Sequence, residues 1–215
     1  MTKMSDNVNH PLKWERDYQR GTAGWSLKTP TPVFQHLLAE TDARGKKIFP
    51  PGRMLVPGAG LGHDAREFAK HGFDVVAVDF AQDAADAMRD AMDDATRHEI
   101  VQSDFFELPR AWNETFDYVL EYTCFCAIDP ARRAEYADTV TRLLKRSGIY
   151  IALAFPLIDS SYSHRVTNGP PFAVDAEELP DLFFARAFVL LRREIHPATI
   201  KPRKGREILI VMQKT

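Results

Sequence analysis

Three closely spaced glycines form the first group of residues that could hold a ligand. The short apolar run Met54–Val56 is followed by Gly58, Gly60 and Gly62, and a helical pattern begins directly afterwards. Because glycine lacks a Cβ atom, the backbone can adopt positive φ there and a ligand can lie against it. The stretch therefore predicts a strand, a tight turn and a helix around a ligand site.

Two acidic residues follow the next two apolar runs. Asp79 ends the run 74–78, and a carboxylate at the end of the second strand of such a unit can accept hydrogen bonds from two ribose hydroxyls. Asp104 stands beside Phe105 after a third short run, where the acid can bind an adenine amino group and the ring can cover its face. The alternative for this pair is a helix cap beside a core phenylalanine. Together with the glycines, the acids predict a bound nucleoside.

The glycine spacing narrows the choice of nucleoside. A dinucleotide-binding turn has the pattern G-x-G-x-x-G, whereas this chain has glycine at every second position from Gly58 to Gly62. The chain also has no G-x-x-x-x-G-K-[ST] loop, which argues against a nucleoside triphosphate. The glycine spacing therefore also argues against a nicotinamide dinucleotide.

Alternating apolar runs and helical patterns must position these residues. The strands expected are 54–56, 75–79, 100–101, 116–122 and 149–155, and the helices expected between them are 64–71, 81–95 and 130–145. Continuous apolar strands are typical of a parallel sheet with helices on both faces. Two last runs, 187–195 and 207–212, predict an antiparallel hairpin on the sheet edge. The predicted fold class is α/β, with a mostly parallel sheet and an antiparallel C-terminal hairpin.

Composition limits the class of protein and its partners. The chain has 215 residues, 45% hydrophobic and 27% charged, with a formal net charge of −2, which suits one globular domain. No basic excess predicts nucleic-acid binding, and no apolar run approaches the roughly 20 residues that cross a membrane. The polar N-terminus predicts no signal peptide, so we expect a cytoplasmic protein. Because the chain is short and has no obvious apolar surface helix, we expect a monomer. The most basic cluster, Lys201–Arg206, is expected to be a solvated loop.

Metal and disulfide chemistry are not expected. Cys124 and Cys126 are only two residues apart, a spacing that rarely forms a disulfide, and we expect them to be core thiols. Two cysteines, and seven histidines without an H-x-x-x-H pair, predict no metal site.

Several runs in order resemble one enzyme superfamily. Leu55–Asp64 is similar to the first motif of the thiopurine S-methyltransferase superfamily, which has proline at the position of Pro57 where most class I methyltransferases have an acid. Glu121–Arg133 is similar to a motif of its halide/thiol methyltransferase branch. Further similar runs lie at 14–25, 169–172 and 203–207. The resemblance covers nearly the whole chain and implies a Rossmann-like class I methyltransferase that converts S-adenosyl-L-methionine to S-adenosyl-L-homocysteine.

The resemblance also implies site residues. The glycine turn would hold the methionine part of the cofactor, Asp79 the ribose, and Asp104 with Phe105 the adenine. The full cofactor-binding set that it implies is Trp14, Tyr18, Trp25, Gly58, Ala59, Gly60, Asp64, Asp79, Asp104, Phe105, Glu121 and Tyr122. We expect residues 1–215 to form a single methyltransferase domain, in which residues 1–30 cover the cofactor and residues 157–173 form a lid loop.

Tyr122 and Trp25 are the candidate catalytic residues. Aromatic faces favour a sulfonium cation by about 0.5–2 kcal/mol, and the Tyr122 hydroxyl can donate to an anionic nucleophile. Thiopurine enzymes carry arginine at the position of Tyr122, so this chain follows the halide/thiol branch. It departs from that branch at Ala59, Tyr18 and Glu121, where cysteine, tryptophan and aspartate are usual.

The predicted reaction is an in-line methyl transfer to a small soft nucleophile: a thiol, hydrosulfide, thiocyanate or a halide. The methyl group of a sulfonium donor is already activated, so the protein supplies mainly alignment and a dry pocket. The alternatives are a methyltransferase for a larger thiol or a metalloid oxyanion, and a nucleoside-binding module without catalysis. In each case the expected partner is a small molecule, not a nucleic acid or a membrane.

Overall fold

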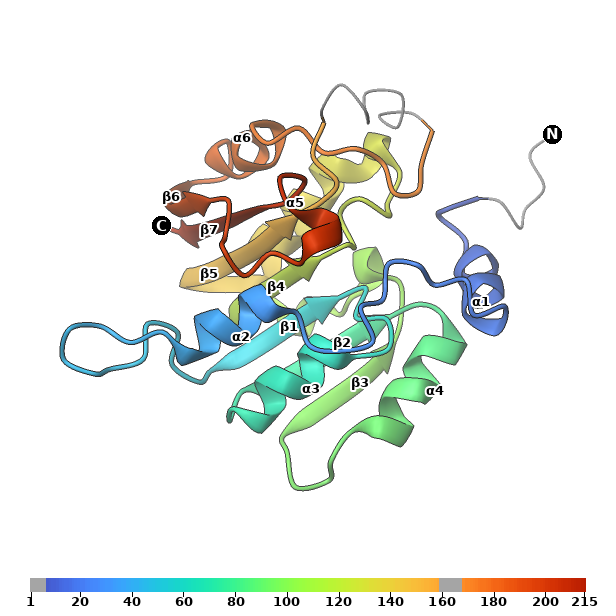
Figure 1. The fold of residues 1–215 in the computed structure, drawn as a ribbon, viewed down its shortest axis with the longest axis horizontal. Coiled ribbons are helices and arrows are strands. Elements are labelled where there is room, and N and C mark those ends of the chain that lie inside the picture. Colours follow the sequence, from blue (N-terminus) through green and yellow to red (C-terminus); the bar gives the residue numbers. More distant parts are fainter. Residues whose placement is uncertain (1–6, 159–167) are drawn as a thin grey trace.

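A seven-stranded sheet with strand order β3-β2-β1-β4-β5-β7-β6 runs through the molecule (Figure 1). The structure is a computed structural model, and it describes residues 7–158 and 168–215. The strands are β1 (Arg53–Pro57), β2 (Asp74–Asp79), β3 (His98–Gln102), β4 (Phe116–Tyr122), β5 (Leu144–Ala154), β6 (Phe188–Glu194) and β7 (Ile208–Lys214). Strands β1 to β5 pair in parallel, and β7 is inserted antiparallel between β5 and β6. The predicted fold class is confirmed, including its C-terminal hairpin.

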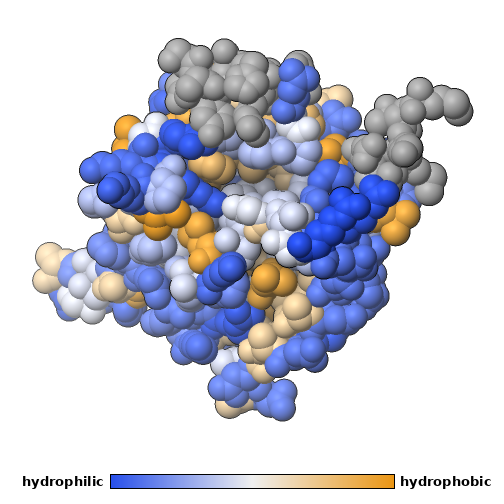
Figure 2. Space-filling model, turned by 45° about the vertical axis from the view of Figure 1, so that its right-hand side comes forward, coloured by the Kyte–Doolittle hydropathy of each residue, from blue (hydrophilic) through white to orange (hydrophobic). Residues whose placement is uncertain are grey.

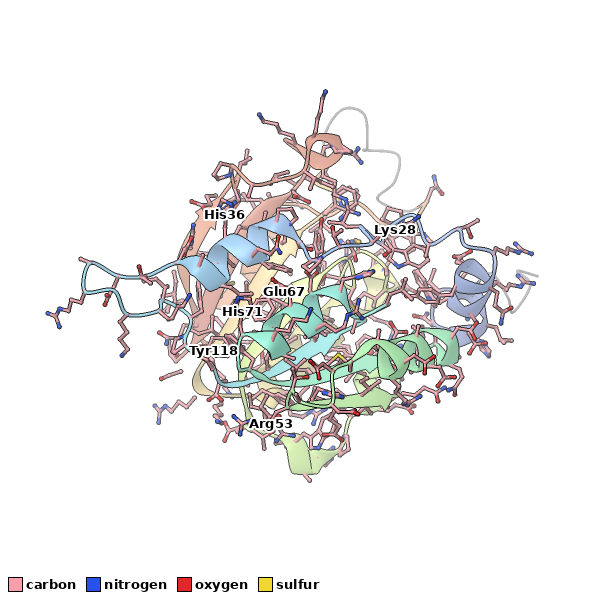
Figure 3. The ribbon with its side chains drawn as sticks, turned by 60° about the horizontal axis from the view of Figure 1, so that its bottom comes forward. Lys28, His36, Arg53, Glu67, His71 and Tyr118 are labelled. Atoms are coloured by element: carbon pink, nitrogen blue, oxygen red, sulfur yellow. The ribbon has the colours of Figure 1, made fainter. Side chains whose placement is uncertain are left out.

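Helices cover both faces of the sheet. They are α1 (Pro11–Gln19), α2 (Pro32–Ala39), α3 (His63–Lys70), α4 (Gln82–Ala91), α5 (Arg133–Leu143) and α6 (Glu178–Phe184). Successive strand residues point to opposite faces, so Met54 joins the core that contains Phe34 of α2, whereas Leu55 joins the core that contains Tyr136 of α5. Figure 3 shows α2 and α3 side by side on one face, with His36 on the first and Glu67 on the second.

Two predicted helices are shorter than expected. The helix expected over 81–95 ends at Ala91, because Met92 is extended and Asp93 then folds a turn with its side chain bonded to the Ala95 amide. The helix expected over 130–145 ends at Leu143, since the fully buried Leu144 already pairs with Phe116 in the sheet. Tertiary pairing overrides the helical pattern in the second case.

The N-terminal segment lies against α4 at the right of Figure 1. Trp14 is 8% exposed and packs on Ala81 and Ala84. The Glu15 carboxylate accepts a hydrogen bond from the Gln82 amide at 3.3 Å, which satisfies one free donor at the start of α4. These contacts fix α1 beside the end of β2.

The loop expected at 157–173 is described only at its two ends, and residues 159–167 lie outside the described residues. Leu157 pairs with Val174, and the amide of the buried Phe172 donates to the Cys126 carbonyl at 2.7 Å. The lid remains a prediction. No helix in the described part of the chain is long and apolar enough to cross a bilayer.

Candidate active site

A cavity of about 570 Å³ opens where β1, β2 and β4 end. The strand order reverses between β1 and β4, and ligands of open α/β sheets bind at such a switch point. Its volume lies within the range of roughly 300–1,000 Å³ usual for ligand pockets. The predicted residues that line it are Trp14, Tyr18, Trp25, Gly58, Asp79, Asp104 and Phe105. Figure 2 shows this side of the molecule, where orange and pale residues lie between blue hydrophilic ones.

A second, smaller cavity of about 60 Å³ adjoins the glycine turn. It is lined by the predicted residues Ala59, Gly60, Asp64 and Tyr122, and it shares Trp25, Gly58 and Thr123 with the larger cavity. All predicted site residues except Glu121 are therefore divided between two adjoining cavities.

All three glycines of the turn have positive φ, at 55°, 57° and 70°. A Cβ atom on Gly58 would lie 2.8 Å from the Cys124 sulfur, and one on Gly62 would lie 2.7 Å from Met88 Cγ. The Ala59 amide donates to the Val78 carbonyl at 2.9 Å, which ties the turn to β2. Both the backbone conformation and the lack of space require glycine here.

Asp79 holds the same turn from the end of β2. One carboxylate oxygen accepts from the Gly60 amide at 2.9 Å and the other from the Ala81 amide at 3.0 Å. The side chain is 7% exposed, and this burial raises the pKa of Asp79 to about 6. Because each carboxylate oxygen has two lone pairs, the group can shape the turn and still accept from a ligand in the cavity.

Asp104 and Phe105 have the structural role that the sequence left open, a helix cap beside a core phenylalanine, and their contact with adenine stays a prediction. Asp104 Oδ1 caps a short helical turn by accepting from the Phe106 amide at 2.9 Å, and Phe105 packs on Tyr136 with ring centroids 5.1 Å apart. Both residues also line the larger cavity. Beside them the Arg132 guanidinium lies 3.6 Å from the Phe106 ring centroid. Arg132 lies within the run that resembles the halide/thiol branch, but its residue type alone gave no signal of a stacked position.

The three aromatic residues of the N-terminal segment meet in one cluster. The rings of Trp14 and Tyr18 lie edge to face with Trp25, at 5.4 and 5.7 Å between centroids. The Trp25 indole also hydrogen bonds to the Tyr18 hydroxyl, whose pKa is raised by burial and then by the Asp79 charge. The cluster closes one side of the larger cavity, and its predicted role in covering the cofactor stays a prediction.

Tyr122 bonds to two neighbouring side chains, and its predicted contacts with cofactor and nucleophile stay predictions. In the described structure it lines only the smaller cavity, and its hydroxyl donates to Glu207 Oε2 at 3.0 Å while it accepts from Arg203. Burial, followed by the charge of Glu207, raises the pKa of the Tyr122 phenol. The hydroxyl proton therefore points at the buried carboxylate of Glu207, which directly precedes β7, rather than into the larger cavity.

The carboxylate of Asp64 accepts hydrogen bonds from the protein itself. It accepts from the amide and the hydroxyl of Thr31 at 2.7 and 2.8 Å, which anchors the start of α2. Burial raises the pKa of Asp64 to about 6.

Glu121 lies beneath the site, and within the described residues it is outside the lining of both cavities. Its carboxylate accepts from the Cys124 and Phe125 amides at 3.1 and 2.9 Å and from the Tyr136 hydroxyl at 2.9 Å. Burial raises the pKa of Glu121 to about 7. These bonds make Glu121 a brace under the turn that carries Cys124, and its predicted contact with the cofactor stays a prediction.

Several residues that line the larger cavity were not among the predicted site residues, although two of them, Pro170 and Pro171, lie in the loop expected as a lid. They are Cys124, Cys126, Phe155, Pro170, Pro171, Arg203 and Arg206 among others. Arg203 is 6% exposed, so the expectation of a solvated loop is wrong for this residue, although Lys201 and Lys204 are exposed. Burial raises the pKa of both cysteines, which keeps them as neutral thiols. Among the described residues, no group of three or more candidate ligands could hold a metal ion.

Comparison with known proteins places this chain in a family. The sequence model of thiopurine S-methyltransferase (TPMT) matches residues 9–207. The chain belongs to the thiopurine S-methyltransferase family. Membership makes it an S-methyltransferase that uses S-adenosylmethionine, which confirms the predicted enzyme class and cofactor.

The relatives include enzymes with different stated acceptors. The chain is 33% identical over 199 residues to probable thiol methyltransferase 2 of Arabidopsis thaliana and 31% identical over 201 residues to thiocyanate methyltransferase 1 of Brassica oleracea. Each match covers 91% of this chain and 82% of the relative. Identity to thiopurine S-methyltransferase of Acinetobacter baylyi is 24%, over 84% and 87% of the two chains.

The fold matches solved methyltransferases. The structure of Burkholderia thailandensis 1,6-didemethyltoxoflavin-N1-methyltransferase, which contains S-adenosylhomocysteine, is similar with a TM-score of 0.69. That match covers 95% of this chain and 87% of the other, at 21% identity. It supports the class I methyltransferase fold.

Proposed function

We propose that this protein transfers the methyl group of S-adenosylmethionine to a small soft nucleophile: a thiol, hydrosulfide, thiocyanate or a halide. The observation that carries the proposal is the composition of the larger cavity. Gly58 of the glycine turn and the acids Asp79 and Asp104 line it, together with aromatic, proline and thiol groups and, among the described residues, three arginines. The greater identity to thiol and thiocyanate methyltransferases than to bacterial thiopurine enzymes supports the same acceptors.

The residues present fit the cofactor. Gly58 lines the larger cavity with bare backbone, so a ligand can lie directly against the turn. Asp79 lines the same space and can accept from ribose hydroxyls. When bound, S-adenosylmethionine supplies a methyl group that is already activated by its positive sulfur.

The chain's own residues then supply alignment and exclusion of water. Trp14, Tyr18 and Trp25 cover one side of the cavity, and aromatic faces attract a sulfonium cation by about 0.5–2 kcal/mol. Cys124 and Cys126 stay protonated, so they do not compete as nucleophiles for the methyl group. A halide, thiocyanate or hydrosulfide is an anion near neutral pH and needs no general base, which fits this lining.

The test is headspace analysis of methylated volatiles with S-adenosylmethionine and one acceptor at a time: iodide, thiocyanate, hydrosulfide or methanethiol. We expect a volatile product from at least one acceptor, and none from the matched variant Asp79→Ala under the same conditions. Thermal stabilisation by S-adenosylhomocysteine is measured in parallel. Stabilisation without any volatile product would contradict the proposed acceptors, and stabilisation by NAD alone would contradict the cofactor.

A further inference from the structure

Arg203 lies at a junction of three distant parts of the chain. Its side chain is 6% exposed, although its neighbours Lys201 and Lys204 are exposed. One guanidinium nitrogen donates to the Trp25 carbonyl at 2.8 Å, and the other terminal nitrogen donates to the Tyr122 hydroxyl. The group also lies over the Phe155 ring, 4.4 Å from its centroid. The guanidinium therefore joins the N-terminal segment to the ends of β4 and β5.

The guanidinium is itself held in place from the sheet. Tyr122, whose ring centroid is 5.0 Å from the Arg203 guanidinium, donates its hydroxyl hydrogen to Glu207. Glu207 is 1% exposed and directly precedes β7. Because a planar guanidinium presents its donors in a fixed fork, rigid neighbours on the sheet fix the direction of the bond to Trp25.

Trp25 is the part of the N-terminal segment that reaches both cavities. The stretch 20–30 that contains it forms no helix or strand, and its turns include local bonds such as Ser26 amide to Ala23 carbonyl. The other end of the segment is fixed at α4 through Trp14 and Glu15. A long-range bond at Trp25 therefore determines where the second half of the segment lies over the site.

We propose that Arg203 is a positioning residue for methyl transfer, which keeps the N-terminal segment closed over the cofactor through the Trp25 carbonyl and fixes the adjoining wall through Tyr122. The proposal rests on the proposed function. It differs from the simpler role of an arginine that attracts the acceptor anion. In that role Arg203 would change acceptor binding only, whereas a residue that holds the cover changes cofactor binding without any acceptor.

The test compares Arg203→Met with Arg193→Met, a matched control that removes an arginine from an exposed ion pair with Glu177. The dissociation constant of S-adenosylhomocysteine is measured by calorimetry with no acceptor present. Loss of charge-assisted bonds predicts binding about tenfold or more weaker in Arg203→Met and unchanged in Arg193→Met. Equal affinity in the two variants, with a raised acceptor KM in Arg203→Met, would overturn the proposal. Failure of the unmodified protein to bind S-adenosylhomocysteine would instead contradict the proposed function.

A second measurement follows the segment directly, without cofactor. Arg20 and Lys28 are exposed trypsin sites in the segment, and Lys28 is labelled in Figure 3. We expect faster cleavage at these sites in Arg203→Met than in Arg193→Met, and cleavage at the control rate would count against the proposal. Arg203→Lys keeps the charge and the stem but not the fork, so it serves if the methionine variant does not fold. It is expected to weaken S-adenosylhomocysteine binding in the same direction.

Discussion

Gly58→Ala is expected to destabilise the protein through two separable effects. Gly58 has φ of 55°, a conformation that costs a residue with a Cβ atom about 1–2 kcal/mol. The new Cβ atom would lie 2.8 Å from Sγ and 2.9 Å from Cβ of Cys124, and overpacking of this kind costs about 1–3 kcal/mol. The sum is about 2–5 kcal/mol. At about 2–4 °C per kcal/mol for a chain of this size, Tm falls by about 4–20 °C.

A matched glycine separates the two effects. Gly45 has φ of 78°, but nothing lies within 4 Å of the position its Cβ atom would take. Gly45→Ala therefore carries the conformational cost alone. The difference in the free energy of unfolding between the two variants, measured by urea denaturation, is the cost of contact with Cys124.

The contact is tested further with Cys124→Gly, which removes both atoms that the new Cβ would meet. In that background Gly58→Ala is expected to lose about 1–3 kcal/mol less than in the unmodified protein. If Gly58→Ala and Gly45→Ala cost the same, and Cys124→Gly gives no relief, the inference that the turn touches Cys124 is wrong.

Three further changes test individual acids and the tyrosine. Asp79→Asn is expected to weaken S-adenosylhomocysteine binding about tenfold or more in calorimetry, because a charged acceptor at the cavity is lost; unchanged affinity would refute a ribose contact. Burial raises the pKa of Glu121 to about 7 in the folded protein. Its contribution to stability is therefore full below the pKa of the unfolded chain and is lost as pH rises towards 7. Glu121→Gln should flatten the fall in Tm between these two pH values, and an unchanged dependence of Tm on pH would argue against the raised pKa. Tyr122→Phe removes the hydroxyl that joins Arg203 to Glu207 and is expected to weaken S-adenosylhomocysteine binding in the same direction as Arg203→Met; unchanged affinity would argue that this bond does not help to hold Arg203.

The glycine turn could be predicted because its information is local. Positive φ at three alternate positions needs glycine at those positions, and the turn follows directly on a strand. The brace from Glu121 is also local, since it bonds to amides three and four residues further along. It was assigned to the cofactor because a resemblance shows which positions belong to a site but not what each side chain contacts.

Arg203 illustrates what the sequence could not show. Its bonds join positions 81 and 178 residues away, and no spacing within the loop 201–206 carries that information. Composition predicted a solvated loop, which is right for the lysines on either side. A single buried guanidinium among exposed cations becomes visible only when the end of β4 and the N-terminal segment are placed beside it.

The two buried acids at the ends of β2 and β4 have similar environments but different consequences. Both accept backbone amides from a turn that follows or adjoins the strand, and burial raises the pKa of both. Asp79 also lines the larger cavity, whereas the second carboxylate oxygen of Glu121 accepts a hydrogen bond from the Tyr136 hydroxyl beneath the cavity. A carboxylate on the cavity side can exchange its bonds with a ligand, but one enclosed by protein donors can only hold the backbone. Loss of Asp79 should therefore affect the ligand first, and loss of Glu121 should affect the turn that carries Cys124 and, through it, the space beside Gly58.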